Sequence, residues 1–440
     1  MNCNIKKNLT GLVFLILFSC DGFLDEKPQK SLLVPQSLKE VRAMLDYYNF
    51  LTNTPLLPFM MSDEWSTTNV EWENFVPWQQ NSYLWRKSIF EPQERSSDYQ
   101  TLHRQMFYAN TALHLLENME SGNSPQNSQM RGEALTLRAR VLFDLATLFL
   151  PGPQSTLKGQ IKIPVNLSQD INASLIRMGI DELLGMIKED LEEAFTILPD
   201  RAEIKTRPDK RTAKAILARI HLYEQNWDKA LSAATYVIEN ADGLMDFKKL
   251  NSSLSYPFSV FNQETIFFQQ MQTSIITIRP TTELSKALYE SYQKNDLRKA
   301  LFFRLSPTQG ALFKGSYTGG FRLFSGIGIS EMYLTAAEAA IRAGKLEEGL
   351  QRLNELGSVR YSDFKPWNSL QQQEALELAI AERNRELVFR CLRWMDMKRL
   401  KYLNPSFQAS REINGTKFTL MEEDQFILDL PPYEVELGMQ

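Results

Sequence analysis

Hydrophobic residues recur every three or four positions over several long stretches of the chain, which is the spacing of amphipathic helices. The clearest stretch is residues 181–198, where Leu183, Leu184, Ile187 and Leu191 share one face. The same period predicts helices over residues 37–50, 98–119, 130–150, 212–240, 331–356 and 370–400. We therefore expect a mainly α-helical fold.

Two of these stretches read as helix–turn–helix units with small residues at matching places. The first carries Ala218, Ala230 and Ala234, and the second carries Ala337 and Gly349. Small residues at such positions let two antiparallel helices approach closely, and the spacing resembles a tetratricopeptide repeat. The alternative is two unrelated helical hairpins, because an independent solenoid needs at least three units.

Two long segments, residues 51–97 and 241–330, lose the helical period. The first is rich in proline, asparagine and glutamine, and it holds four of the seven tryptophans of the chain. The second contains two short apolar runs, residues 265–269 and 274–278, that we predict to be strands. We expect both segments to form long irregular loops with a few short strands.

The start of the chain has the form of an export signal. Two lysines precede an apolar run over residues 9–18, and Ser19–Cys20 follows directly. A basic start, a short apolar run and a small residue before the cut describe a secretory signal peptide that is too short to span a bilayer. We therefore predict a signal peptide over residues 1–19 and an extended, acidic tether over residues 20–36.

The residues at the predicted cut resemble a bacterial lipobox. Leu17-Phe18-Ser19-Cys20 places a cysteine where that motif has its lipidated first residue. The alternative is an ordinary cleaved signal with an incidental cysteine. We predict lipidation of Cys20, because two or three acyl chains, at about 0.8 kcal/mol per buried methylene, would hold a water-soluble body on a membrane.

Composition and charge exclude several classes of function. The chain has 440 residues and a net charge of −4, and no basic tract appears, so we predict no nucleic-acid partner. After the signal there is no apolar run long enough for a transmembrane helix. Of three cysteines, Cys3 leaves with the signal and Cys20 would be acylated, so Cys391 is left without a disulfide partner. We expect Cys391 to be a small buried hydrophobe rather than a nucleophile.

Charged residues in the last long helix invite a catalytic interpretation that we do not favour. Glu382, Glu386 and Asp396 are the acids, and arginines stand one or two turns away from each of them, at positions 383, 385, 393 and 399. This spacing favours structural ion pairs. Elsewhere, the adjacent carboxylates of Asp63 and Glu64 are poorly placed to act across one glycosidic bond.

Neither the histidines nor the glycines of the chain form a recognisable site. His103, His114 and His221 have no metal-ligand spacing. The glycine-rich segment around Gly319 lacks the lysine and hydroxyl of a phosphate-binding loop. We therefore predict no catalytic residue, no metal site and no cofactor, and we expect a binding protein rather than an enzyme.

The aromatic residues of the first loop segment are the best candidates for function. Flat rings stack on the apolar faces of sugars, while neighbouring polar groups bond the hydroxyls. The alternative is that these rings only fix a long loop to the helical body. The predicted ligand-binding residues are Trp65, Trp72, Trp78, Tyr83, Trp85 and Asp63, with Tyr317 and Arg322 of the glycine-rich segment, next to Phe321, as further candidates.

Four blocks of sequence, in order along the chain, resemble the SusD/RagB family of outer-membrane lipoproteins in Bacteroidetes nutrient uptake. The blocks are Cys20-Asp21-Gly22-Phe23-Leu24-Asp25 with Pro28, Gly132 to Leu145, Glu331 to Asn354, and Glu382 to Arg399. The chain departs from the family at Arg390-Cys391, where an acidic residue and a glycine are common.

The resemblance implies a fold and a role. The fold would be one SusD-like domain over residues 37–440, with tetratricopeptide-like helices at about 98–240 and 331–400 and ligand-facing loops at about 51–97 and 241–330. The protein would capture a glycan, an oligosaccharide or a peptide at the cell surface and pass it to a SusC-like TonB-dependent β-barrel transporter. The alternatives are a lipid-anchored scaffold that binds only protein, and a surface hydrolase.

Overall fold

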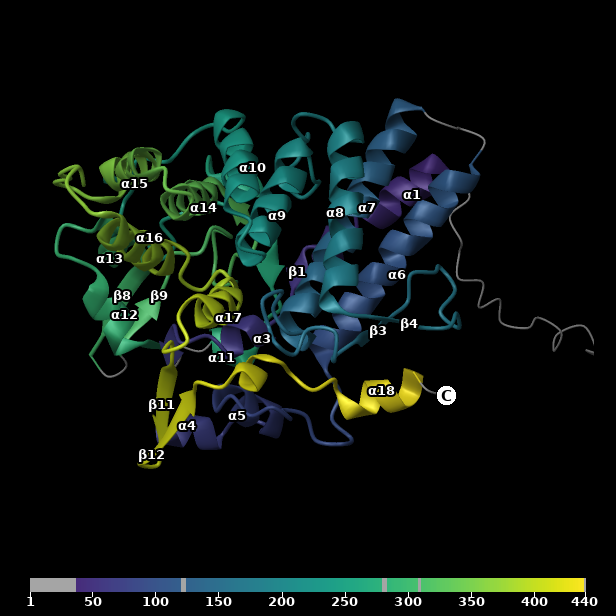
Figure 1. Ribbon diagram of the computed structural model, residues 1–440, viewed down its shortest axis with the longest axis horizontal. Coiled ribbons are helices and arrows are strands. Elements are labelled where there is room, and N and C mark those ends of the chain that lie inside the picture. Colours follow the sequence, from purple (N-terminus) through teal and green to yellow (C-terminus); the bar gives the residue numbers. More distant parts are fainter. Residues whose placement is uncertain (1–36, 120–123, 279–282, 308–309, 439–440) are drawn as a thin grey trace, which may run out of the picture. The chain divides into compact units, whose positions relative to one another are not determined.

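The computed structural model describes residues 37–119, 124–278, 283–307 and 310–438 (Figure 1). The predicted signal peptide over residues 1–19, the lipidation site Cys20 and the tether over residues 20–36 lie outside the described residues. Within the described residues, no helix is long and apolar enough to cross a membrane.

A succession of antiparallel helices forms the body of the fold. Each packs on the next: α6 on α7, α7 on α8, α8 on α9, α9 on α10, α10 on α14 and α14 on α15 (Figure 1). Their bounds are α6 (Ser97–Asn118), α7 (Pro125–Phe149), α8 (Ile180–Ile197), α9 (Lys210–Tyr223), α10 (Trp227–Glu239), α14 (Ile329–Arg342) and α15 (Leu346–Arg360). The predicted mainly α, repeat-like architecture is confirmed.

Local sequence explains the ends of these helices and the closeness of their packing. Ser96 and Ser124 accept hydrogen bonds from backbone N–H groups in the first turns of α6 and α7, which is the role of a helix cap. At Gly349 in α15, an added Cβ would lie 2.4 Å from the Ile341 side chain and 2.9 Å from the Ala337 carbonyl. Only glycine permits α14 and α15 to approach so closely.

The two predicted loop segments contain regular structure and pair with each other. Strand β1 pairs in parallel with β6, and a four-stranded sheet has the order β2-β7-β9-β8. Both therefore join the first segment to the second. The strands are β1 (Asn53–Thr54), β2 (Trp65–Ser66), β6 (Gln270–Met271), β7 (Glu283–Leu284), β8 (Phe303–Ser306) and β9 (Gly310–Phe313).

The remaining strands form three antiparallel pairs. They are β3 (Ile163–Val165) with β4 (Ile176–Met178), β5 (Thr265–Phe267) with β10 (Ile327–Gly328), and β11 (Ala409–Ile413) with β12 (Thr416–Leu420). The strand predicted at residues 265–269 is thus confirmed in its first part.

The hydrophobic interior is divided into two clusters. The first fills the helical body. The second, which we call the second core, lies between the two former loop segments and includes Phe59, Trp65, Tyr83, Phe258 and Tyr317. The long segments are therefore held by a core of their own, and the aromatic residues supply much of it.

Three local predictions are wrong. Residues 274–278 contain the short helix α11 (Ile275–Ile278) instead of a strand, because a run of three isoleucines and one threonine does not distinguish the two. Residues 51–97 contain the short helices α3 (Leu57–Met60), α4 (Asn69–Glu73) and α5 (Pro77–Tyr83). The helix predicted over residues 370–400 is broken into α16 (Gln372–Glu386) and α17 (Arg393–Leu403).

The break between α16 and α17 has a backbone cause. Phe389 and Cys391 have φ angles of 59° and 62°, in the left-handed region that no right-handed helix contains. The sequence between the two helices has neither glycine nor proline, so the helical period runs through it without a visible stop signal.

The other short elements complete the chain. They are α1 (Leu38–Leu45), α2 (Tyr48–Leu51), α12 (Lys286–Ser291), α13 (Leu297–Phe302), α18 (Pro432–Gly438) and single 3₁₀ turns at Phe247–Lys249 and Glu423–Phe426. Phe426, Ile427 and Leu428 are buried, so this apolar segment near the end of the chain packs back on the body.

Candidate ligand-binding surface

Four of the predicted ligand-binding rings are buried: Trp65, Tyr83 and Tyr317 in the second core, and Trp85 in the core of the helical body. Trp65, Tyr83 and Trp85 are each 2% exposed, and Tyr317 is fully buried. The Trp65 and Trp85 indoles donate hydrogen bonds to the backbone carbonyls of Phe59 and Met61. Side chains this buried present no face to a sugar in this structure, so they form the scaffold beneath any ligand surface.

Three of these rings surround a buried cation that the sequence analysis did not find. The guanidinium carbon of Arg411 lies 5.4, 3.9 and 4.4 Å from the ring centroids of Trp65, Tyr83 and Trp85. Arg411 comes from β11, far along the chain, and burial lowers its pKa to about 10. The ring faces and backbone carbonyls take the place of a carboxylate partner.

Asp63 and Glu64 lie in the same region but hold the fold together. Asp63 accepts two hydrogen bonds from Arg393, at 2.6 and 2.7 Å. Glu64 is 2% exposed, and it accepts a hydrogen bond of 3.1 Å from the backbone N–H of Phe389. Burial raises the pKa of Glu64 to about 8. Both carboxylates therefore fix the break between α16 and α17.

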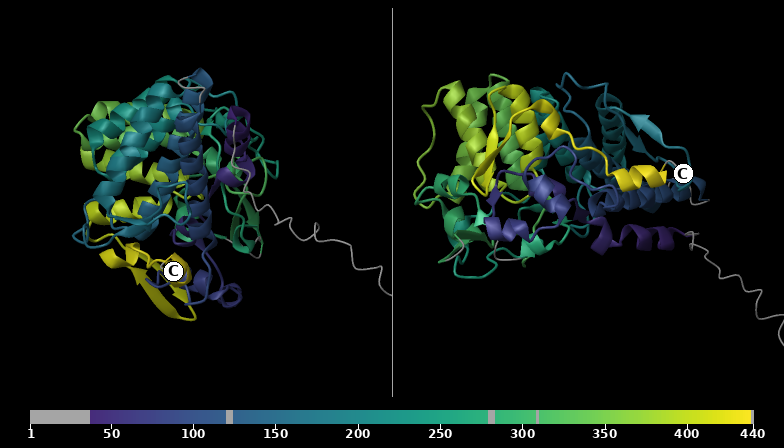
Figure 2. Two further views of the ribbon diagram at one scale, coloured as in Figure 1. Left: turned by 90° about the vertical axis from the view of Figure 1, so that its right-hand side faces the viewer. Right: turned by 90° about the horizontal axis from the view of Figure 1, so that it is seen from below.

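Trp72 and Trp78 keep part of their surface exposed. Trp72 lies in α4 and Trp78 in α5, and both pack against the second core from outside. The loop of the β11–β12 hairpin borders α4, since Asn414 bonds to Asn69 and Glu73 (Figure 2). Of the rings predicted in residues 51–97, these two are the ones that the structure leaves accessible.

A larger exposed aromatic surface lies on two neighbouring loops, residues 251–261 and 314–322, which we call the loop pair. The loops touch: an added Cβ at Gly319 would lie 3.1 Å from the Val260 nitrogen, and the Lys314 ammonium donates to the Ser252 carbonyl at 2.5 Å. Apolar side chains point outward from both loops. They are Leu254, Tyr256, Val260, Phe261 and Phe321, with exposed fractions from 42% to 53%.

The loop pair combines these rings with polar groups on a firm base. Arg322 and the serines at positions 252, 253, 255 and 259 are exposed beside the rings. Beneath them, Phe258 and Tyr317 pack in the second core with ring centroids 5.0 Å apart. Phe261 holds a φ of 55°, which a bulky residue adopts only where its surroundings enforce it. The arrangement offers flat apolar faces and hydroxyls on a rigid support.

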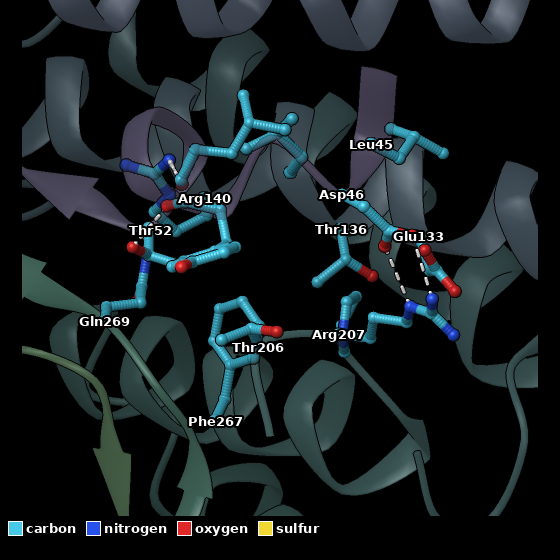
Figure 3. A pocket seen from close by; sticks show the side chains of 14 residues that line it. Leu45, Asp46, Thr52, Glu133, Thr136, Arg140, Thr206, Arg207, Phe267 and Gln269 are labelled. Carbon is cyan, nitrogen blue, oxygen red and sulfur yellow. Dashed lines mark hydrogen bonds and ion pairs between the residues drawn. The ribbon is translucent and has the colours of Figure 1, made fainter. Parts of the chain in front are cut away.

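One small cavity lies away from the loop pair, between α1–α2, α7 and the turn at residues 206–208 (Figure 3). Its polar wall is an ion pair, with Arg207 bonded to Asp46 through two contacts of 2.9 Å. The cavity volume is about 40 Å³. That is room for about three water molecules and too little for a sugar ring.

The charged residues of α16 and α17 are structural ion pairs, as predicted. Fully buried Arg298 contacts Asp296, Glu382 and Glu386 at 2.8, 2.7 and 3.2 Å. Burial raises the pKa of Glu382, but the charges of Arg298 and Arg385 outweigh it and lower that pKa to about 2. Asp396 joins α16 to α17 by pairing with Arg383 and Arg399.

The remaining candidate groups show no arrangement for chemistry. The three histidines lie on α6 and α9, and no cluster of metal-ligating side chains occurs among the described residues. Cys391 as a residue is half-buried rather than fully buried as expected, and its thiol donates to the Pro55 carbonyl at 3.5 Å. Burial raises the pKa of this thiol well above its ordinary value, which disfavours the nucleophilic thiolate.

Known proteins share both sequence and fold with this chain. Residues 22–222 match the family described as "Starch-binding associating with outer membrane", and residues 324–429 match the SusD family. The SusD-like protein P2 of Formosa agariphila is 25% identical over 379 residues, which cover 69% of this chain and 74% of that protein.

Solved structures extend the likeness to nearly the whole fold. A SusD superfamily protein of Bacteroides thetaiotaomicron superposes with a TM-score of 0.73 at 18% identity, over 91% of this chain and 97% of the other. A SusD-like carbohydrate binding protein of Bacteroides vulgatus gives 0.70 at 17% identity, over 92% and 97%. Together with the two family matches, which lie in the same order along the chain, these likenesses lead to one conclusion: the chain belongs to the SusD/RagB family.

Proposed function

We propose that this protein binds a glycan at the cell surface and passes it to a TonB-dependent outer-membrane transporter. The observation that carries the proposal is the loop pair, where Tyr256, Phe261 and Phe321 stand exposed among serine hydroxyls and Arg322. Rings of this kind stack on sugar faces, and the neighbouring hydroxyls and guanidinium bond the sugar hydroxyls. The carbohydrate-binding name of a structural neighbour supports a glycan rather than a peptide.

The proposed action is capture without bond cleavage. The second core holds the loop pair in one arrangement before ligand arrives, so little conformational entropy is lost on binding. Trp72 and Trp78 border the same core and extend the surface that a longer glycan would meet. The ligand would then be released to the transporter by a change in the relative position of the two proteins.

The ligand proposal is tested by affinity electrophoresis of the mature chain through gels that contain single polysaccharides. We expect retarded migration in at least one of them and no release of sugar. Phe321→Ala and Tyr256→Ala should each weaken retention by about two- to tenfold, since one ring contact contributes about 0.5–1.5 kcal/mol.

The matched control is Tyr47→Ala, which removes a ring of similar exposure, 47%, from the corner of α1 and α2. It should leave retention unchanged. Loss of retention in the control but not in the two loop-pair variants would place the site elsewhere. Released sugar would favour the hydrolase, and absence of retention on all polysaccharides would favour the scaffold.

The proposed anchor and partner rest on sequence and family. The lipobox-like residues before Cys20 support attachment to the outer membrane, which the family description also names.

The helical array supplies a surface for a protein partner: a groove of about 580 Å³ runs between α8 and α10 over α9. We expect a β-barrel transporter to co-purify with the tagged protein from solubilised outer membranes, and to be lost when Lys229 and Ser232 of the groove are replaced by glutamate.

A further inference from the structure

A second interior cavity lies between α7, α9 and α17, closed by residues 54–58, Gln269, Ser325 and residues 390–392. Its volume is about 40 Å³. That is room for about three water molecules, or for one monatomic anion with less water. Its lining includes three arginines, at positions 140, 219 and 390, and one aspartate, Asp144.

Three guanidinium groups line this cavity, and one of them has no ion-pair partner. Arg140 contacts Asp144 at 2.9 Å, and Arg219 contacts Glu331 at 2.5 and 2.7 Å. No carboxylate among the described residues lies within ion-pair distance of Arg390. Among the described residues, Arg390 is therefore the one guanidinium of the three that lacks a direct ion pair.

The N–H groups of Arg390 also lack acceptors in the described part of the chain. The side chain is 5% exposed, and its guanidinium carbon lies 4.0 Å from the Tyr317 ring and 5.0 Å from the Phe324 ring. The two rings cover the face of the guanidinium group, so it is the N–H edge of this group that is left to line the cavity. Buried donors without acceptors are costly, and more so when they carry charge.

The neighbouring carboxylates are already engaged. Glu264 accepts from Tyr317 and Arg360, and Glu386 accepts from Arg360 and Arg298. Their negative charge reaches Arg390 at longer range, but their oxygens do not supply an acceptor to its N–H groups.

Two further donors converge on the same cavity from other elements. The Gln269 side-chain amide and the Trp394 indole N–H are buried, and neither has an acceptor among the described residues. Both side chains line the cavity together with Arg390. The Arg390 guanidinium, which has no direct ion pair, and these two unpaired donors line one small space. Charged and neutral donors grouped in this way can hold an anion.

We propose that this cavity binds a monovalent anion of halide size, held by Arg390, Gln269 and Trp394. The anion neutralises Arg390 and ties the break between α16 and α17 to the helical body. The cavity lining contains no residue of the loop pair, although the Tyr317 ring from that pair covers the Arg390 guanidinium. The proposal does not depend on the proposed glycan function.

Bromide is the probe for the first test, because its anomalous scattering distinguishes it from water. Crystals of the mature chain grown in sodium bromide should show one anomalous peak within hydrogen-bond distance of the Arg390 guanidinium. A cavity that contains only water under these conditions would overturn the proposal.

The second test measures the melting temperature against bromide concentration, with gluconate keeping the ionic strength constant. We expect a saturable rise for the wild type. Arg390→Met should weaken the apparent bromide affinity at least about tenfold, as expected for a lost hydrogen bond to a charge. Trp394→Phe removes the indole N–H donor but keeps an aromatic ring, smaller than the indole, at this buried position. It should weaken affinity by a smaller factor, and it serves if Arg390→Met does not fold.

The control is Arg86→Met, which removes an exposed arginine. It should keep the wild-type dependence on bromide. If the cavity variants and the control all show the wild-type dependence, the salt effect is general and no anion site exists.

Discussion

The carboxylate of Asp63 and the guanidinium of Arg393, 330 positions apart in the sequence, are joined by two hydrogen bonds of 2.6 and 2.7 Å. Asp63 lies just before β2, and Arg393 is the first residue of α17. The contact fastens the start of α17 to the second core. Asp63, which the sequence offered as a candidate ligand-binding residue, thus forms a structural ion pair with Arg393.

Removal of this charge pair should lower the free energy of unfolding. Asp63→Asn leaves Arg393, 11% exposed, without its partner. Because the Asp63 side chain is 26% exposed, we expect a loss of about 1–3 kcal/mol, less than for a fully buried pair. Urea denaturation of both proteins at neutral pH measures it. Glu203→Gln, which removes one partner of an exposed pair with Arg207, should change little; an equal loss there would contradict the argument.

The effect of Asp63→Asn should vanish in acid. Burial raises the pKa of Asp63, but the charge and hydrogen bonds of Arg393 outweigh it, so the pKa lies below its ordinary value of 3.8. The stability contributed by the pair is therefore present above pH 3.8 and is lost as the pH falls through the folded-state pKa. Below the folded-state pKa, the free energies of unfolding of the wild type and the variant should therefore become equal, which the same denaturation experiment measures.

Glu64 should make the protein less stable as the pH rises. Burial raises its pKa to about 8, from an ordinary value of 4.5, so the folded state keeps a proton that the unfolded chain has lost. Stability contributed by this proton is full below pH 4.5 and falls away as the pH rises to about 8.

Glu64→Gln tests this dependence, because an amide keeps the shape of a carboxyl group without titrating. Relative to wild type, the variant should gain about 1–3 kcal/mol of unfolding free energy between pH 5 and pH 9. Denaturation midpoints at several pH values measure the difference. Parallel profiles for the two proteins would show that Glu64 does not titrate in this range.

Two glycines in helices should respond to alanine with opposite signs. Gly349→Ala places a methyl group 2.4 Å from the Ile341 side chain, so α14 and α15 must separate, and we expect a loss of about 1–3 kcal/mol. Gly185→Ala in α8 meets no atom within 4 Å and should gain about 0.5–1 kcal/mol from helix propensity. Thermal melts of the two variants measure these changes in stability. An increase in stability at both sites would contradict the close packing of α14 against α15.

Replacement of Cys20 tests the proposed anchor. Cys20→Ala should abolish incorporation of a labelled fatty acid and move the protein from the membrane fraction to the soluble fraction. Cys391→Ala is the matched control, because it removes the other cysteine of the mature chain. It should leave both labelling and fractionation unchanged; membrane retention of Cys20→Ala would rule out the anchor.

The helical body was predictable because its residues repeat with one period. Stretches such as residues 181–198 bury one face along their whole length, so local spacing is enough to find the helix. The break at Phe389 was not predictable, because its left-handed backbone is stabilised by distant groups, among them the Glu64 carboxylate. No local pattern records such a contact.

The candidate surface was predicted less well than the fold. Trp65, Tyr83 and Trp85 were predicted to stack on ligand, because the residue type of an aromatic ring does not reveal whether the ring is exposed or buried. Distant residues help to bury them, among them Arg411, more than 300 positions later in the chain. Phe321 and Arg322 are exposed at the tip of a turn, and the glycines beside them marked that turn in the sequence. No local pattern marked Tyr256 or Phe261 as exposed.

The second core also constrains the order in which the protein acquires its structure. The amino end emerges first during synthesis and export, so Trp65 and Trp85 appear more than 300 positions before Arg411, the cation that they enclose. Until then these indoles have no interior to enter, and a nascent chain of this kind is exposed to aggregation. The second core can therefore be completed only after β11 has emerged, which places this step late in folding.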